Sequence, residues 1–179
     1  MRLFFAINFN NETRTRLLEL RDELRRQSER GRFSLPENLH LTLAFLGECD
    51  AGQIAAAKSA HGMVGFEPFD IAIDRIGRFK RGNRDVRPGG DLWWSGLREC
   101  IPLIALLRDL AEKLTALGFS LDDRKFSPHI TLGREVVTDV KPWTIEPFGE
   151  TVSKIDLMKS ERIGGRMVYT AISFPQGHI

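Results

Sequence analysis

The sequence predicts an α+β fold in which antiparallel sheets are backed by helices. Most of its predicted strands alternate apolar and polar residues, which is typical of strands with one buried face. Three helical segments interrupt the strands without the regular alternation of a doubly wound parallel sheet. A weak internal repeat adds a third observation, because His40-Leu41-Thr42-Leu43 recurs as His129-Ile130-Thr131-Leu132 about half a chain later. We therefore expect a bilobal, pseudo-duplicated fold with two antiparallel sheets lining a central cleft and helices packed outside.

The first elements follow from apolar periodicity and capping residues. Alternation predicts a strand at 2–9, and an apolar stripe predicts a helix through 12–30. Asn10 or Asn11 can cap this helix, and Gly31 is expected to stop it.

The second strand and the second helix have clear boundary residues. Pro36 precedes a strand at 38–46, and Gly47 is expected to end it. An alanine-rich helix at 51–64 then begins after Asp50, a suitable N-cap.

The middle of the chain predicts two strands and the most regular amphipathic helix. Strands at 69–79 and 91–97 flank a loop rich in charge and glycine. The helix at 101–118 has Pro102 in its first turn and Gly118 at its end.

The C-terminal part predicts only strands. They lie at 127–136, 150–163 and 166–174, and a Gly-Gly turn joins the last two. With no flexible linker or low-complexity segment, residues 1–179 are expected to form a single domain of two intertwined lobes.

Bulk composition excludes several classes of protein. The 179 residues are 42% hydrophobic and 28% charged, as in a globular protein, and no apolar run approaches the roughly 20 residues of a membrane helix. Cys49 and Cys100 do not form a disulfide framework, so a reduced, cytoplasmic protein is expected. A net charge of +2 does not by itself indicate a polyanion partner. We expect no membrane association and, by default, a monomer.

The repeated His-x-Thr motif points to acid–base chemistry. Residues two apart in a strand share a face, so His40 lies beside Thr42 and His129 beside Thr131, with the aliphatic residues on the core face. Two imidazoles with an ordinary pKa of roughly 6.5 can act as acid and base near neutral pH. Two hydroxyls can bind the oxygens of a phosphate. This set suits cleavage of a phosphodiester without a metal, and the structural alternative is a duplicated strand with a solvated polar face.

Other chemistries have less support in the sequence. A zinc site needs three or four ligands. No sequence pattern suggests that His61 and His178 join the two motif histidines as ligands. No Gly-x-Ser-x-Gly, Walker loop or Gly-x-Gly-x-x-Gly motif occurs. We therefore predict no metal and no cofactor.

Paired His-x-Thr motifs in a chain of this length resemble the 2H phosphoesterase superfamily. The segments RLFFAI, NLHLTLAFLG, LWWSGL and SPHITLGR are similar to bacterial and archaeal RNA 2′,3′-cyclic phosphodiesterases, also called 2′-5′ RNA ligases, over essentially the whole chain. The resemblance implies a metal-independent conversion of RNA 2′,3′-cyclic phosphate ends, tRNA fragments among them, to 2′-phosphates. It also implies that His40 is the proton donor, that His129 is the proton acceptor, and that Thr42 and Thr131 bind the phosphate.

The resemblance leaves the substrate and the direction of reaction open. Run backwards with a 5′-hydroxyl RNA, the same site can form a 2′-5′ linkage. Competing interpretations are the same chemistry on a cyclic phosphate of ADP-ribose or on a 2′-5′ oligonucleotide, and a non-catalytic module that binds RNA ends.

Arg134 is a further candidate for phosphate binding. Strict alternation puts it on the face opposite His129, but a β-bulge at Gly133 would return it to the cleft. The alternative is a surface arginine.

A basic run and several aromatic residues are weaker candidates. The cluster at 75–87 can hold an RNA backbone or form an ordinary solvated loop; its basic members are Arg75, Arg78, Lys80, Arg81, Arg84 and Arg87. Phe79 is suited to stacking on a base or to the core. One member of each pair Phe4–Phe5 and Trp93–Trp94 is expected to face the core.

Overall fold

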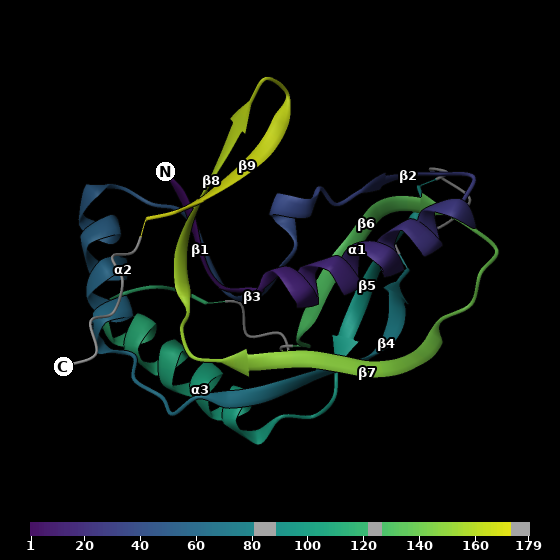
Figure 1. The fold of residues 1–179 in the computed structure, drawn as a ribbon. Helices are drawn as coiled ribbons and strands as arrows, with labels where there is room; N and C mark the ends of the chain where they lie inside the picture. Colours follow the sequence, from purple (N-terminus) through teal and green to yellow (C-terminus); the bar gives the residue numbers. More distant parts are fainter. Residues whose placement is uncertain (81–88, 122–126, 173–179) are drawn as a thin grey trace.

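A computed structural model describes residues 1–80, 89–121 and 127–172. These residues form two antiparallel sheets and three helices, which confirms the predicted α+β class (Figure 1). The four-stranded sheet has the order β3 (His40–Glu48), β1 (Arg2–Asn8), β8 (Asp156–Ile163) and β9 (Arg166–Ala171). The five-stranded sheet has the order β2 (Arg30–Phe33), β6 (His129–Val137), β5 (Asp91–Leu97), β4 (Phe69–Phe79) and β7 (Trp143–Val152). The helices are α1 (Asn11–Arg26), α2 (Ala51–Met63) and α3 (Ile101–Ala116), and a short 3-10 turn, η1, covers Pro36–Asn38.

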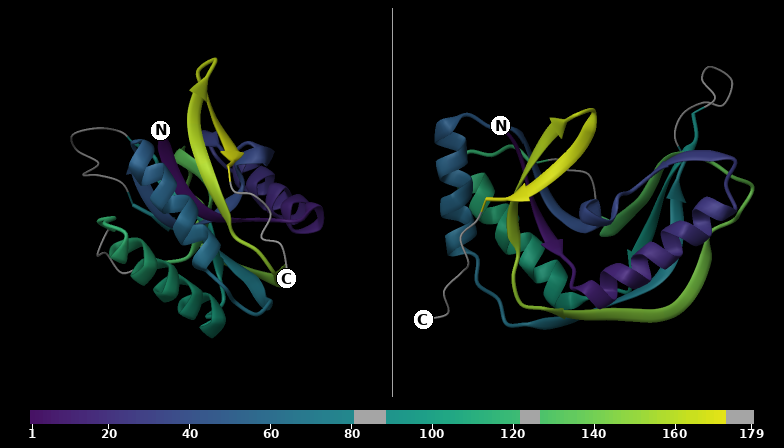
Figure 2. Two further views of the ribbon diagram at one scale, coloured as in Figure 1. Left: turned by 90° about the vertical axis from the view of Figure 1, so that its left-hand side faces the viewer. Right: turned by 45° about the horizontal axis from the view of Figure 1, so that its top comes forward.

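The two sheets share one continuous apolar core. The aliphatic residues of both motifs, Leu41, Leu43, Ile130 and Leu132, are buried in it together with leucines of α1 and α3. Figure 2 shows α2 and α3 side by side at one end of the molecule, α1 along the five-stranded sheet, and the β8–β9 hairpin projecting from the other sheet.

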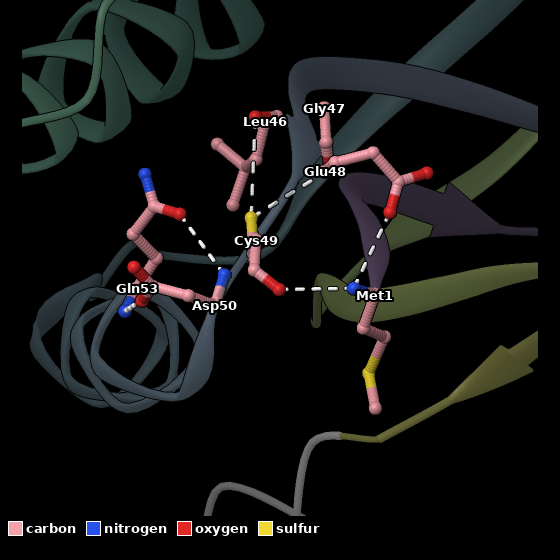
Figure 3. Close-up of polar contacts among 7 residues, drawn as sticks. All are labelled: Met1, Leu46, Gly47, Glu48, Cys49, Asp50 and Gln53. Carbon is pink, nitrogen blue, oxygen red and sulfur yellow. Dashed lines mark hydrogen bonds and ion pairs between the residues drawn. The ribbon is translucent and has the colours of Figure 1, made fainter.

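The start of β1 is tied to the end of β3 and to α2 (Figure 3). The Met1 ammonium donates to the Cys49 carbonyl at 2.9 Å and pairs with Glu48, while the Cys49 amide donates to the Met1 carbonyl. Asp50 and Gln53 then form a capping box at the start of α2, which confirms Asp50 as its N-cap. Cys49 and Cys100 are both free thiols.

The first prediction that the structure corrects is the end of α1. The helix ends at Arg26, and Gly31 lies inside β2 rather than stopping the helix. Two arginines and a glycine make β2 a weak strand by composition, so its pairing with β6, not its own propensity, forms it. Gly47 likewise does not end β3; it lies within the strand at a bulge opposite Leu3, with a φ of 72°.

The second correction concerns the predicted strand at 150–163. Residues 150–152 belong to β7 and residues 156–163 to β8, which lies in the other sheet, while residues 153–155 connect the two. β7 is difficult to recognise in the sequence, because it contains Pro147 and most of its positions are exposed or only half-buried. Among the described residues the strand lies at the edge of its sheet, paired with β4, and an edge strand tolerates proline.

Candidate active site

The first motif lies at the start of β3, where alternation orients it as predicted. His40 and Thr42 are half-buried, while Leu41 and Leu43 are buried in the core. On the neighbouring strand β1, Asn8 lies opposite His40 and Ala6 lies opposite Thr42. The small Ala6 side chain leaves space beside the threonine, and Asp156 of β8 lies on its other side in the same row.

The second motif occupies the start of β6 in the other sheet. His129 and Thr131 are half-buried, and the aliphatic residues between and after them are buried. The His129 Nδ1 lies 2.8 Å from the Ser127 carbonyl, which can only accept, so Nδ1 carries a proton and donates it to this carbonyl. The Ser34 hydroxyl donates to the Thr131 carbonyl and fixes this part of β6.

The two motif strands come from different sheets but contact each other. Arg134 of β6 lies near enough to His40 of β3 for its charge to lower the pKa of that imidazole. The fold therefore gathers residues that are far apart in the sequence into one polar region.

His40 is difficult to protonate in this environment. Burial is the main cause and lowers its pKa from 6.5 to about 4; a hydrogen bond to the Asn38 backbone opposes the shift, and the nearby Arg134 charge adds to it. In the unliganded protein His40 is accordingly neutral at neutral pH. A bound anion would reverse part of this effect, because it offsets the arginine charge and stabilises imidazolium.

Each histidine lies against two aromatic rings. The His40 ring is 5.0 Å from Phe4 and 5.1 Å from Tyr169, which meets it edge-on. The His129 ring is 5.2 Å from Phe79, also edge-on, and 6.4 Å from Trp94. Phe4, Phe79 and Trp94 thus line the site, whereas Phe5 and Trp93 lie fully buried in the core. Phe79 is exposed at 38% and so lies outside the core, while its stacking on a base stays a prediction.

Arg134 is returned to the face of His129 by a bulge, as the sequence suggested. Trp93 and Trp94 are adjacent on β5, but their partners Gly133 and Thr131 are two residues apart on β6. Leu132 and Gly133 consequently both face the core, and Arg134 emerges exposed. A second irregularity follows at Glu135, which has a positive φ of 54°.

Two residues near the motifs were not singled out in the sequence, and a third, Arg75, was named there only as a member of the basic run. Asp156 shares the row of Thr42, Tyr169 contacts His40, and Arg75 lies in the row of His129 across Gly96. A side chain at Gly96 would come within 3.0 Å of the Arg75 side chain, so this glycine permits the arginine to lie beside the site. Only strand pairing reveals these neighbours, and no local sequence signal marks them.

The basic run at 75–87 divides into distinct parts. Arg75 pairs with Asp74, while Arg78 pairs with Asp91 and lies over the buried Trp93, on the opposite face from His129. Arg81, Arg84 and Arg87 lie outside the described residues.

The described part of the chain offers neither a metal site nor a membrane helix. In residues 1–80, 89–121 and 127–172, no group of three or more His, Cys, Asp or Glu side chains is placed to hold a metal ion. Within the same ranges, no helix is both long and apolar enough to cross a membrane. His61 is buried, with Nε2 2.9 Å from the Ile155 carbonyl, as a structural histidine.

Comparison with known proteins agrees with this geometry. A family model described as LigT-like phosphoesterase matches residues 7–88. An RNA 2′,3′-cyclic phosphodiesterase of Archaeoglobus fulgidus is 34% identical over 157 residues, covering 84% of this chain and 85% of the relative. The chain belongs to the LigT-like phosphoesterase family. The RNA 2′,3′-cyclic phosphodiesterase of Escherichia coli is also 34% identical, over 176 residues that cover 96% of this chain and 93% of the relative.

Solved LigT-like structures have the same fold. The apo form of E. coli LigT superposes with a TM-score of 0.80 at 30% identity, covering 96% of this chain and 94% of its own. A structure of the E. coli protein complexed with 3′-AMP gives 0.79, with the same identity and coverage. A Thermus thermophilus protein gives 0.82 at 28% identity, covering 97% of this chain and 96% of its own. The family and fold class predicted from the sequence are therefore confirmed.

Proposed function

We propose that this LigT-like phosphoesterase hydrolyses RNA 2′,3′-cyclic phosphate ends to 2′-phosphates without a metal. His40 would be the acid, His129 the base, and Thr42, Thr131 and Arg134 the phosphate ligands. The observation that carries this proposal is the convergence of two His-x-Thr strands from different sheets, with Arg134 within electrostatic reach of His40. The names of the E. coli and A. fulgidus relatives support the substrate class.

The proposed reaction is a single in-line displacement at phosphorus. His129 Nε2, the ring nitrogen that is not bonded to Ser127, takes a proton from water as the water oxygen bonds to phosphorus. The P–O3′ bond breaks, and His40 gives its proton to O3′. The products are a 2′-phosphate and a 3′-hydroxyl. With the 5′-hydroxyl of a second RNA in place of water as the nucleophile, the same groups would break P–O3′ and form a 2′-5′ linkage.

His40 can serve as the acid only if the substrate changes its protonation. Its pKa of about 4 favours the neutral form in the unliganded protein, which by itself suits a base better than an acid. The cyclic phosphate is an anion, and its charge beside His40 raises the imidazole pKa in the complex. Arg134 would bind the same phosphate, whose negative charge would then offset the effect of the arginine on the His40 pKa. The donor role therefore depends on bound substrate.

The decisive experiment uses a short RNA with a 2′,3′-cyclic phosphate, incubated with the protein in the presence of EDTA. We expect turnover to a 2′-phosphate, identified by comparison with authentic 2′- and 3′-phosphate ends. Loss of turnover on chelation would contradict the metal-free reaction, and a 3′-phosphate product would contradict cleavage of P–O3′.

The same experiment separates the alternatives. Turnover of a cyclic phosphate on ADP-ribose or of a 2′-5′ oligonucleotide, but not of the RNA, would keep the site and change the substrate. Binding of the RNA without any product would favour a module that recognises RNA ends.

A further inference from the structure

A row of arginines continues from the proposed site onto the edge strand β2. In the antiparallel pairing of β2 with β6, Arg32 lies directly opposite Arg134. Residues directly opposite each other share a face of the sheet, so Arg32 lies on the face that carries His129 and Thr131. The polar surface of the site thus extends to the edge of the five-stranded sheet.

Arg30 prolongs this row along β2. The strand alternates exposed Arg30, half-buried Gly31, exposed Arg32 and half-buried Phe33, so both arginines project from one face. Arg26, at the exposed end of α1, precedes them in the chain. We call Arg30 and Arg32 the β2 arginine row. Figure 1 shows β2 along the outer side of β6, away from α2 and α3.

The pairing of Arg32 with Arg134 has an electrostatic cost in the free protein. Like charges directly opposite each other on neighbouring strands destabilise the pairing. Glu135 offsets part of this cost through an exposed ion pair with Arg32, and Glu29 is another exposed carboxylate nearby in the chain. Exposed ion pairs contribute at most about 1 kcal/mol, so an incoming phosphate can readily replace the carboxylate. A bound polyanion would relieve the repulsion that the sheet imposes.

The spacing of the row also matches a polynucleotide. Side chains two residues apart on one face of a strand are separated by roughly 6.6 Å, which is comparable with the spacing of successive phosphates in an extended single strand. Arginine forms bidentate hydrogen bonds with phosphate, and such contacts fix the position of a nucleic acid without reading its sequence.

We propose that the RNA phosphates next to the reacting end bind along Arg32 and Arg30. This inference rests on the proposed function and defines the substrate as a single-stranded RNA chain longer than one nucleotide. Arg134 holds the reacting phosphate, and the β2 arginine row holds the strand that leads to it. Arg30 and Arg32 add affinity for the chain and make no contact with the reacting atoms.

The test compares one variant on two substrates. Arg30→Gln combined with Arg32→Gln is assayed on 2′,3′-cyclic AMP and on a short RNA with a 2′,3′-cyclic phosphate end. We expect kcat/KM for the RNA to fall by on the order of tenfold, and its dependence on log salt to flatten by about 1.4, the value for two phosphate contacts on a single strand. Activity on the mononucleotide should stay within about twofold of wild type, because no phosphate beyond the cyclic one is present.

A matched control removes two positive charges elsewhere. Lys58→Gln with Arg108→Gln changes the net charge equally on the exposed surfaces of α2 and α3 and should leave both substrates and the salt slope unchanged. Equal loss on both substrates in the β2 variant, or the same RNA-specific loss in the control, would overturn the inference.

A binding measurement keeps this test separate from that of the proposed function. Fluorescence anisotropy of a labelled RNA with a 2′-phosphate end reports strand binding even if the wild-type protein turned over neither substrate. The β2 variant should bind this RNA on the order of tenfold more weakly than wild type and the control. Unchanged affinity would refute the β2 arginine row as a binding surface, whatever the fate of the proposed reaction.

Discussion

The two copies of the His-x-Thr motif have the same local structure and different surroundings. His40 lies between Phe4 and Tyr169, with a pKa of about 4, and Asp156 lies in the row of Thr42. His129 has its Nδ1 fixed by the Ser127 carbonyl and shares its sheet face with Arg75 and Arg134. A duplicated motif therefore supplies two equivalent imidazoles, while the neighbouring strands make them unequal. Under the proposed function, a bound phosphate must offset this inequality before His40 can give a proton.

Removing either imidazole should have the largest effect. We expect His40→Ala and His129→Ala each to lower kcat by about 10²–10⁴-fold on a cyclic-phosphate RNA, the usual contribution of a general acid or base. Thermal melting should show that both variants remain folded, because each histidine is only half-buried. Full activity in one variant would contradict a requirement for both histidines and show that only one of them is essential.

Arg134 tests whether the two halves act on one phosphate. Arg134→Gln should lower kcat/KM by about 10- to 100-fold, the equivalent of one hydrogen bond to a charged group. It should also raise the His40 pKa, since the arginine charge lowers it. Arg108→Gln on α3 serves as a charge-matched control. A loss of activity in which the His40 pKa did not move would place Arg134 away from the first motif.

The two threonines should contribute less than the histidines and Arg134, and about as much as each other. Thr42→Val and Thr131→Val each remove one hydroxyl donor from an intact site, so we expect kcat/KM to fall by about 3- to 10-fold. Similar losses in the two variants would indicate that both hydroxyls bind the same phosphate. A loss confined to one of them would show that the motif is duplicated in structure but not in function.

Tyr169 tests the origin of the asymmetry. Tyr169→Ala exposes one side of the His40 ring and should raise its pKa from about 4 towards 6.5, as followed by NMR titration of the four histidines. Tyr169→Phe keeps the ring and removes only the hydroxyl, so the pKa should stay near its original value. If both variants raised the pKa equally, the hydroxyl rather than burial would be responsible.

The same shift predicts a modest dependence of stability on pH. Between about 6.5 and about 4 the unfolded chain protonates His40 while the native state does not, so acidification favours unfolding over this range. Urea unfolding at about pH 7 and about pH 5 should show a decrease in stability that is smaller in His40→Gln, which has no group to protonate. An identical decrease in the variant would assign it to other groups.

Much of this site could be predicted from local sequence because alternation in a strand is a local property. It correctly placed the side chains of both motifs, and Gly133 indicated the bulge that redirects Arg134. The short strand β2 and the edge strand β7 were missed, because pairing with β6 and β4 forms them against weak local propensity. Asp156 and Tyr169 lie near the first motif because β8 and β9 follow β1 in the four-stranded sheet. The local sequence around the motif does not predict that strand order. The asymmetry between the histidines was unpredictable for the same reason.

The most direct test of the account is hydrolysis of a 2′,3′-cyclic nucleotide whose O3′ is replaced by sulfur. A thiolate has a pKa of about 8.5 and leaves without help from an acid. If His40 is the donor, His40→Ala should regain activity on this substrate to within about tenfold of wild type, whereas His129→Ala should remain impaired because water still needs a base. Rescue of His129→Ala instead, with His40→Ala still inactive, would contradict the assignment of the two roles.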